Sequence, residues 1–169
     1  DKAETRSSAD ILSAYEAQAK AAPIAVARND GDAAAAFASA AKTLEATFTF
    51  PYLAHAALEP LNSVAMMTDG VVEIWAGHQM PDLYQFIASQ IAGVTPDKIR
   101  LHVMRSGGGF GRRAVFDADV IAESVEVAKA LNWSRPVKVQ WTRDNDMKGG
   151  RDRPAYVHRE NDGRDQDGQ

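Results

Sequence analysis

The sequence has no cysteine among its 169 residues. This absence excludes a disulfide framework, a thiolate metal site and cysteine ligands for an iron–sulfur cluster within the chain. No apolar run is long enough to span a bilayer, and the first residues lack the pattern of a secretory signal. The formal net charge is −4 and the basic residues are scattered, which argues against a general nucleic-acid binder.

The composition is that of a globular protein, with 45% hydrophobic and 25% charged residues. Residues 1–43 are alanine-rich and polar, and they predict two weakly packed helices, over 11–22 and 33–42. We therefore expect a helical N-terminal segment or linker over 1–43, an α+β domain over 44–159, and a polar, truncated tail over 160–169.

The central part of the chain alternates between strand and helix patterns. Apolar and polar residues alternate over 44–50, which predicts a half-buried strand. The order that follows is strand, strand, helix, strand, helix, strand, and Asp69-Gly70 predicts a hairpin between the first two strands. Because a helix between two strands favours parallel pairing, we predict a mixed sheet with helices over one face. The predicted strands are 62–67, 71–77, 99–104, 137–141 and 155–159, the helices are 81–92 and 115–131, and 143–154 is a charged loop.

The most informative segment is a glycine-rich loop at 106–113, with the sequence Ser-Gly-Gly-Gly-Phe-Gly-Arg-Arg. Glycine has no Cβ, so this backbone can approach a ligand closely. A predicted strand enters the loop and a predicted helix leaves it, so that free N–H groups and the helix dipole would face a bound anion. The two arginines add forked donors suited to phosphate. A tight turn without ligand, a flexible lid and a close-packing role are the alternatives.

Other polar residues predict weaker sites. His55 and Glu59 have the spacing of a metal or acid–base pair on a helix, but flanking prolines disfavour a helix there. A hydrogen bond between these two side chains is the favoured interpretation. His78 and Gln79 follow a strand, where ligand-facing groups often lie, and His78 is expected to be a surface or hydrogen-bonding residue. The acidic residues over 117–126 are expected to form a solvated helix face.

Several motifs follow one another in a familiar order between residues 32 and 159. They are His-Ala-Ala-Leu-Glu-Pro at 55–60, the strand that ends at Gln79, the glycine loop, Arg-Pro-Val-Lys at 135–138, and then Arg143, Arg153-Pro154 and His158. Together they resemble the large subunits of the molybdenum hydroxylases, the family of xanthine dehydrogenase and aldehyde oxidase. The two arginines after the loop are most similar to the bacterial branch with isoquinoline 1-oxidoreductase and membrane-associated aldehyde dehydrogenases.

The resemblance implies a molybdenum–molybdopterin cofactor, often as its cytosine dinucleotide. It also implies an oxidoreductase that hydroxylates N-heterocycles or oxidises aldehydes, with water as the oxygen source. By motif, Gln79 would hydrogen-bond an oxygen ligand of the molybdenum. Ala114 stands where purine-oxidising members have a glutamate, which disfavours a purine substrate. The implied cofactor-binding residues are Gln79, Gly107, Gly108, Gly109, Phe110, Gly111 and Arg112.

The subunits that the chain resembles are several times longer, and their catalytic glutamate lies downstream of the matching part. We therefore expect a fragment without a catalytic residue that does not retain the cofactor by itself. The parent would contain the rest of the large subunit and an iron–sulfur subunit or domain, in the bacterial cytoplasm or periplasm. From the residues alone, a stand-alone phosphate- or nucleotide-binding module and a purely structural α+β domain remain open.

Overall fold

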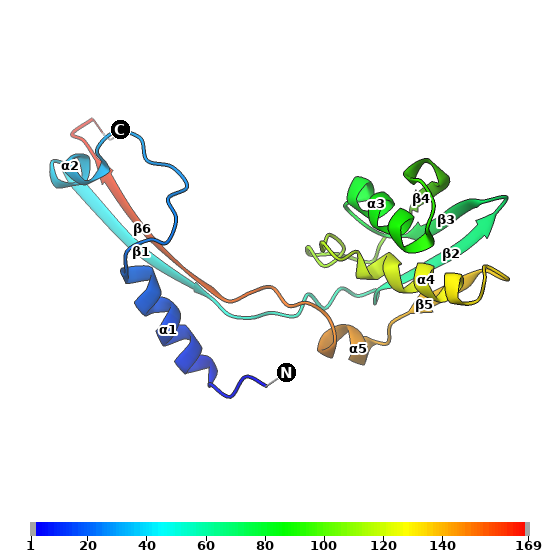
Figure 1. The fold of residues 1–169 in the computed structure, drawn as a ribbon. Helices are drawn as coiled ribbons and strands as arrows, with labels where there is room; N and C mark the ends of the chain where they lie inside the picture. Colours follow the sequence, from blue (N-terminus) through cyan, green and yellow to red (C-terminus); the bar gives the residue numbers. More distant parts are fainter. Residues whose placement is uncertain (1–2, 168–169) are drawn as a thin grey trace. The chain divides into compact units, whose positions relative to one another are not determined.

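The computed structural model describes residues 3–167, which divide into two units (Figure 1). The ribbon unit contains Asp1–Leu53 and Arg153–Gln169, and the sheet unit contains Ala54–Asp152. The domain limits expected from the sequence, at 43/44 and 159/160, fall inside two strands of the ribbon unit. Those strands pair with each other, which is why both ends of the chain belong to one unit.

The ribbon unit is built on two antiparallel strands, β1 (Lys42–Phe50) and β6 (Tyr156–Arg164). All residues of β1 have a partner in β6. The predicted end of the last strand at Arg159 is wrong. The strand continues to Arg164, because residues 160–164 complete the hydrogen-bond ladder with the first half of β1.

Helices α1 (Ser8–Lys20) and α2 (Ala33–Ala38) contact β6. The first helix begins earlier than predicted because Ser7 and Asp10 form a capping box. The Asp10 N–H donates to Ser7 Oγ at 3.2 Å, and the Ser7 N–H donates to Asp10 Oδ2 at 3.0 Å. Neither helix has a buried residue, which agrees with the weak packing predicted for this part of the sequence.

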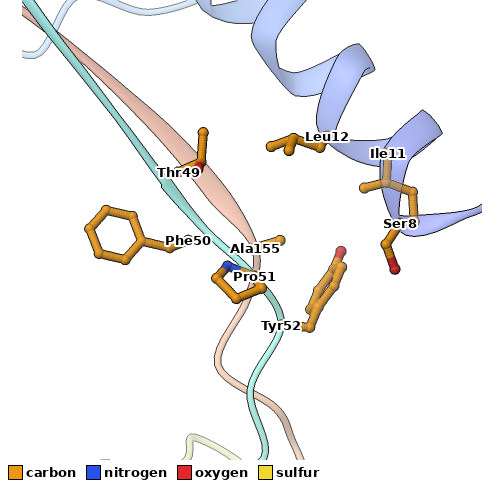
Figure 2. Close-up of a pocket in the computed structure, with 8 residues that line it drawn as sticks. All are labelled: Ser8, Ile11, Leu12, Thr49, Phe50, Pro51, Tyr52 and Ala155. Atoms are coloured by element: carbon orange, nitrogen blue, oxygen red, sulfur yellow. The ribbon is translucent and has the colours of Figure 1, made fainter.

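The two helices lie on the more polar face of the ribbon. Figure 2 shows a pocket of about 220 Å³ between α1 and the end of β1, where Thr49 faces Leu12 and Phe50 points away from the helix. The side chains that alternate with Thr49 and face away include Leu44 and Phe48, which are 62% and 47% exposed. The predicted half-burial of this strand is therefore wrong, because the helices cover the opposite face.

The sheet unit is a four-stranded mixed sheet in the order β4-β3-β2-β5, with helices α3 and α4 over one face (Figure 1). The predicted α+β class is confirmed. The hairpin is confirmed as well, because Asp69 and Gly70 turn the chain with left-handed φ values of 52° and 76°. The elements are β2 (Asn62–Thr68), β3 (Val71–Ala76), α3 (Pro81–Ala92), β4 (Ile99–Val103), α4 (Asp119–Ala130) and β5 (Val137–Gln140), with a 3-10 turn at Pro96–Lys98.

Only one of the two helical crossovers joins paired strands. The strands flanking α3 pair in parallel, β3 with β4, as expected. The strands flanking α4 do not pair, because α4 packs over β2 and carries the chain to the other edge. There β5 pairs antiparallel with β2, so the parallel pair expected across this helix is absent.

Two further helix limits differ from the sequence prediction. The segment before α4 forms turns that end at Ala118 with φ of 53°, so α4 begins at Asp119 instead of at 115. The predicted charged loop contains a short helix, α5 (Arg143–Lys148), which begins where Thr142 Oγ1 accepts the Asn145 N–H at 3.2 Å. Within residues 3–167, no helix has the length and hydropathy needed to cross a bilayer.

The hydrophobic core lies between the sheet and the two covering helices. Its fully buried members include Ala65, Val72 and Ile74 from the sheet, Tyr84 and Ala88 from α3, and Ile121 and Val125 from α4. The Ser63 hydroxyl, also buried, donates to Ser124 Oγ at 2.8 Å, which satisfies a polar group inside this core. Burial of this size is expected to make the sheet unit the more stable of the two.

Substitutions on α4 test this core. Val125 is fully buried and Val127, on the same helix, is 43% exposed. We expect Val125→Ala to lower the free energy of unfolding by about 2 kcal/mol, and Val127→Ala to change it by less than about 0.5 kcal/mol. Tryptophan fluorescence in urea isolates the sheet unit, because all three tryptophans lie within it. Equal losses in the two variants would contradict this assignment of the core.

Candidate functional site

The glycine loop lies beside the end of β3, where Gln79 follows the strand. The Gln79 N–H donates to the carbonyl of Arg113 at 3.0 Å. A Cβ built on Gly109 would lie 3.1 Å from Gln79 Oε1. The structure therefore brings together the two segments that the sequence assigned to one site.

The loop requires glycine for two different reasons. At Gly107 the reason is space, since a Cβ would lie 2.6 Å from Glu59 Cβ and 3.2 Å from the Glu59 nitrogen. At Gly108 and Gly111 it is the backbone, whose φ values of 101° and 95° disfavour any residue with a side chain. Phe110 between them also has a positive φ, 53°, and its side chain is 76% exposed.

Four consecutive N–H groups of this loop have no hydrogen-bond acceptor in the described residues. In the described part of the chain, the N–H groups of Gly108, Gly109, Phe110 and Gly111 have no acceptor. Their neighbours at the two ends of this run are used internally: the Gly107 N–H donates to Glu59 Oε2 at 2.6 Å, and the Arg112 N–H to the Gly109 carbonyl at 2.9 Å. Adjacent unpaired amides are groups with which protein loops can bind an anion or an oxo group.

The guanidinium of Arg113 holds the loop against two other segments. Its side chain is 1% exposed. Nε donates to the Gly108 carbonyl at 2.8 Å, Nη1 to the Gly77 carbonyl at 3.1 Å, and Nη2 to the Glu59 carbonyl at 3.0 Å. Nη2 also lies 3.2 Å from Glu59 Oε2, which balances the buried charge.

Glu59 accepts from the loop and not from His55. The backbone N–H of Gly107 and the Asn62 amide, at 2.8 Å from Oε1, hold the pKa of Glu59 below its usual value. The prediction of a hydrogen bond between His55 and Glu59 is therefore wrong, although the segment is irregular as predicted. His55 Nδ1 is buried without a partner in the described residues, and Nε2 would lie 3.8 Å from a Cβ on Gly111.

Arg112 turns to the other side of the loop. Its guanidinium donates to Asp119 at 2.9 and 2.6 Å and lies 5.4 Å from the centre of the Trp141 ring. Because the side chains of Arg112 and Arg113 both bind protein groups, the backbone amides are the donors that the loop offers to a ligand. The acidic residues of 117–126 are also engaged, since Asp119 binds Arg112 and Glu123 accepts from Trp141 Nε1 at 2.7 Å. The expected solvated face is thus partly wrong.

Two buried rings support the back of the loop. The Tyr84 hydroxyl donates to the Arg113 carbonyl at 3.1 Å and accepts the Val115 N–H at 3.2 Å, and burial raises the pKa of Tyr84 to about 12. His78 packs against Tyr84 with a centroid distance of 5.3 Å. The expectation of a surface or hydrogen-bonded His78 is wrong. The residue is 6% exposed, neither ring nitrogen has a partner within residues 3–167, and burial lowers its pKa.

Sequence reasoning missed several residues that shape the site. It assigned no role to Arg113 as an internal anchor, nor to Asp119 as the partner of Arg112. Arg143 appeared only as a motif position, although its Nη2 donates to the carbonyls of Ala57 and Leu58, at 2.6 Å each. The sequence feature that could have indicated these contacts is the pair of arginines beside the glycine loop. A buried arginine needs carbonyl or carboxylate acceptors within the protein. Within residues 3–167, no three His, Asp or Glu side chains gather in a way that could hold a metal ion.

Comparison with known proteins gives one family. A family model described as molybdopterin cofactor-binding domain matches residues 16–169. The sequence is 35% identical over 105 residues to the isoquinoline 1-oxidoreductase subunit beta of Brevundimonas diminuta, which covers 62% of this chain and 13% of that protein. It is 32% identical over 141 residues to the aldehyde oxidoreductase molybdenum-binding subunit PaoC of Escherichia coli K12, which covers 83% of this chain and 19% of that protein.

Solved structures show the same fold. Quinoline 2-oxidoreductase from Pseudomonas putida 86 aligns with a TM-score of 0.63 and 22% sequence identity, covering 79% of this chain and 17% of that one. The chain spans less than a fifth of the length of each of these relatives.

Burial of His78 predicts a pH-dependent stability. Its folded-state pKa lies below the unfolded value of about 6.5, so the unfolded chain binds the proton more readily. The free energy of unfolding should therefore be constant above pH 7 and fall as the pH drops from about 6.5 to 5, by at most about 1.4 kcal/mol per unit. Urea titrations monitored by tryptophan fluorescence measure this.

Two histidine variants test whether His78 causes this pH dependence of the free energy of unfolding. His78→Phe should remove the loss between pH 7 and 5. His158→Phe should keep it, because His158 lies in β6 of the ribbon unit, which contains none of the three tryptophans. A His78→Phe profile parallel to that of the parent would show that another group is responsible.

Proposed function

The chain belongs to the molybdopterin cofactor-binding domain family, and from that premise we propose that Gln79 and the glycine loop at 107–111 form one wall of the molybdenum cofactor site. The observation that carries this proposal is the run of unpaired amides from Gly108 to Gly111, in which Gly109 lies next to the Gln79 side chain. The predicted resemblance to molybdenum hydroxylase large subunits is confirmed by the family match and by the relatives.

The residues present suit a molybdopterin cofactor. Oxo and phosphate oxygens are acceptors, and the loop offers several N–H donors without a Cβ that would keep the ligand at a distance. Gln79 adds an amide that can both donate and accept. When bound, the molybdenum centre supplies two-electron oxidation chemistry with water as the oxygen source.

In this proposal the residues of the wall have different roles. Gly108, Gly109 and Gly111 present N–H groups at close range, and Phe110 adds an exposed apolar ring that excludes water beside them. Gly107 ties the loop to Glu59. Arg112 acts through its ion pair with Asp119, which fixes the exit of the loop.

We propose further that the parent protein oxidises an aldehyde or hydroxylates an N-heterocycle. Support comes from the relatives, whose names describe an isoquinoline oxidoreductase and an aldehyde oxidoreductase. By the motif resemblance, Ala114 stands where purine-oxidising members would have a glutamate, which favours a non-purine substrate. In this proposal the chain contributes cofactor binding, while the catalytic base lies in other residues of the large subunit.

Electron transfer would need a partner. The sequence has no cysteine, so iron–sulfur clusters would have to be held by another subunit or domain. The cytosine dinucleotide form of the cofactor and the loss of cofactor from the isolated residues 1–169 belong to the same proposal. The family match favours a molybdopterin-binding role over a stand-alone nucleotide-binding module and over a purely structural domain.

Two substitutions in the full-length gene product test the cofactor site. Expression in a host that makes molybdopterin, followed by metal analysis and detection of oxidised pterin, gives the occupancy. We expect Gly109→Ala, which places a methyl group against Gln79 Oε1, to lower molybdenum occupancy by about tenfold. Gln79→Ala should reduce turnover per molybdenum on aldehydes or N-heterocycles by about a hundredfold.

Gln90→Ala is the matched control, because Gln90 is also an exposed glutamine and lies on α3 away from the loop. It should behave like the parent in both measurements. Full molybdenum occupancy and normal turnover in the Gly109→Ala and Gln79→Ala variants would refute the proposed site.

A further inference from the structure

Three consecutive carbonyls in the irregular segment before β2 are bound by arginines from two distant parts of the chain. Arg143 Nη2 donates to the carbonyls of Ala57 and Leu58, at 2.6 Å each. Arg113 Nη2 donates to the next carbonyl, that of Glu59, at 3.0 Å. No strand ladder satisfies these groups, because the segment is not part of the sheet.

The short helix α5 aims Arg143 at this segment. Arg143 is its first residue, directly after the Thr142 cap. Asp146, one turn later and only 5% exposed, places Oδ2 3.4 Å from Arg143 Nη1 and so restrains the guanidinium. The chain just after α5 also reaches the loop exit, since a Cβ on Gly150 would lie 3.2 Å from Arg112 Nε.

The bound segment is the one that carries Glu59. The Glu59 carboxylate must lie within 2.6 Å of the Gly107 nitrogen and within 3.2 Å of Arg113 Nη2. A shift of an irregular segment by about 1 Å would break such bonds, because hydrogen-bond strength falls steeply beyond ordinary distances. Arg113 alone holds one of the three carbonyls, and Arg143 holds the other two.

We propose that Arg143 is a positioning residue for the glycine loop: by clamping the carbonyls of Ala57 and Leu58 it keeps Glu59 on the Gly107 N–H, and so fixes the position of the loop amides that follow. Within residues 3–167, Arg143 has no hydrogen bond or ion pair with the loop itself. The inference rests on the proposed function only for the identity of that ligand, because the clamp and the loop geometry exist in the chain itself.

Arg143→Ala tests the clamp in residues 1–169 without cofactor. Nuclear magnetic resonance gives the exchange rate of the Gly107 amide and the titration of the Glu59 carboxyl in one sample. We expect Gly107 exchange to become about tenfold faster. The pKa of Glu59 should rise toward the ordinary value of about 4.3, because the Gly107 N–H is the main group that lowers it. The core amide of Ile74, in a fully buried residue of β3, should keep its protection.

Two more variants on α5 complete the test. Lys148→Ala removes an exposed pair with Asp144 on the same helix and should leave Gly107 and Glu59 unchanged. Arg143→Lys keeps a cationic donor with a different reach and should give values between those of the parent and Arg143→Ala.

The inference is overturned if Arg143→Ala matches Lys148→Ala in both measurements. It is also overturned if Ile74 loses protection as strongly as Gly107, since Arg143 would then stabilise the whole sheet unit and not the loop. None of these measurements needs molybdopterin. A clamp that behaves as expected in a chain whose full-length product binds no molybdenum would therefore refute the proposed function and leave the inference intact.

Discussion

The buried guanidinium of Arg113 is the interaction on which the candidate site depends. A charge that is 1% exposed is costly unless its donors find acceptors, and here the acceptors come from three segments: the irregular run before β2, the end of β3 and the glycine loop. The loop therefore has its place because Arg113 needs the carbonyls of Gly77, Gly108 and Glu59 at once. The carboxylate of Glu59 then balances the charge and binds the first amide of the loop.

The loop and the segments beside it use their backbone carbonyls and amides differently. Arg113 binds the carbonyls of Gly108, Gly77 and Glu59, and Arg143 binds those of Ala57 and Leu58. The amides of 108–111 have no acceptor in the described residues. Free amides are what an anion-binding loop needs, because an N–H that is already bound within the protein cannot donate to a ligand. Of the two arginines that the sequence suggested as ligand donors, Arg113 therefore binds carbonyls and Arg112 binds the Asp119 carboxylate.

The two units differ in how much apolar surface they bury. The sheet unit has a contiguous core between sheet and helices, and its rigid strand ends support the site. The ribbon unit has a two-stranded sheet whose helices cover the polar face and leave side chains such as Leu44 and Phe48 exposed. Two strands bury too little surface to be very stable alone, so the sheet unit is expected to be the more stable of the two.

Local signals in the sequence determined the hairpin at Asp69-Gly70, the helix that begins at Pro81, and the motif positions of Gln79 and the glycine loop, because each depends on residues close together in the chain. Only the tertiary structure decided that β1 pairs with β6, that β5 joins β2, and that Glu59 binds Gly107 instead of His55. Those choices join residues that lie tens of residues apart. The strand pairings follow from which edges can complete a hydrogen-bond ladder, and the Glu59 contact follows from the buried charge of Arg113; no pattern within a short window records either requirement.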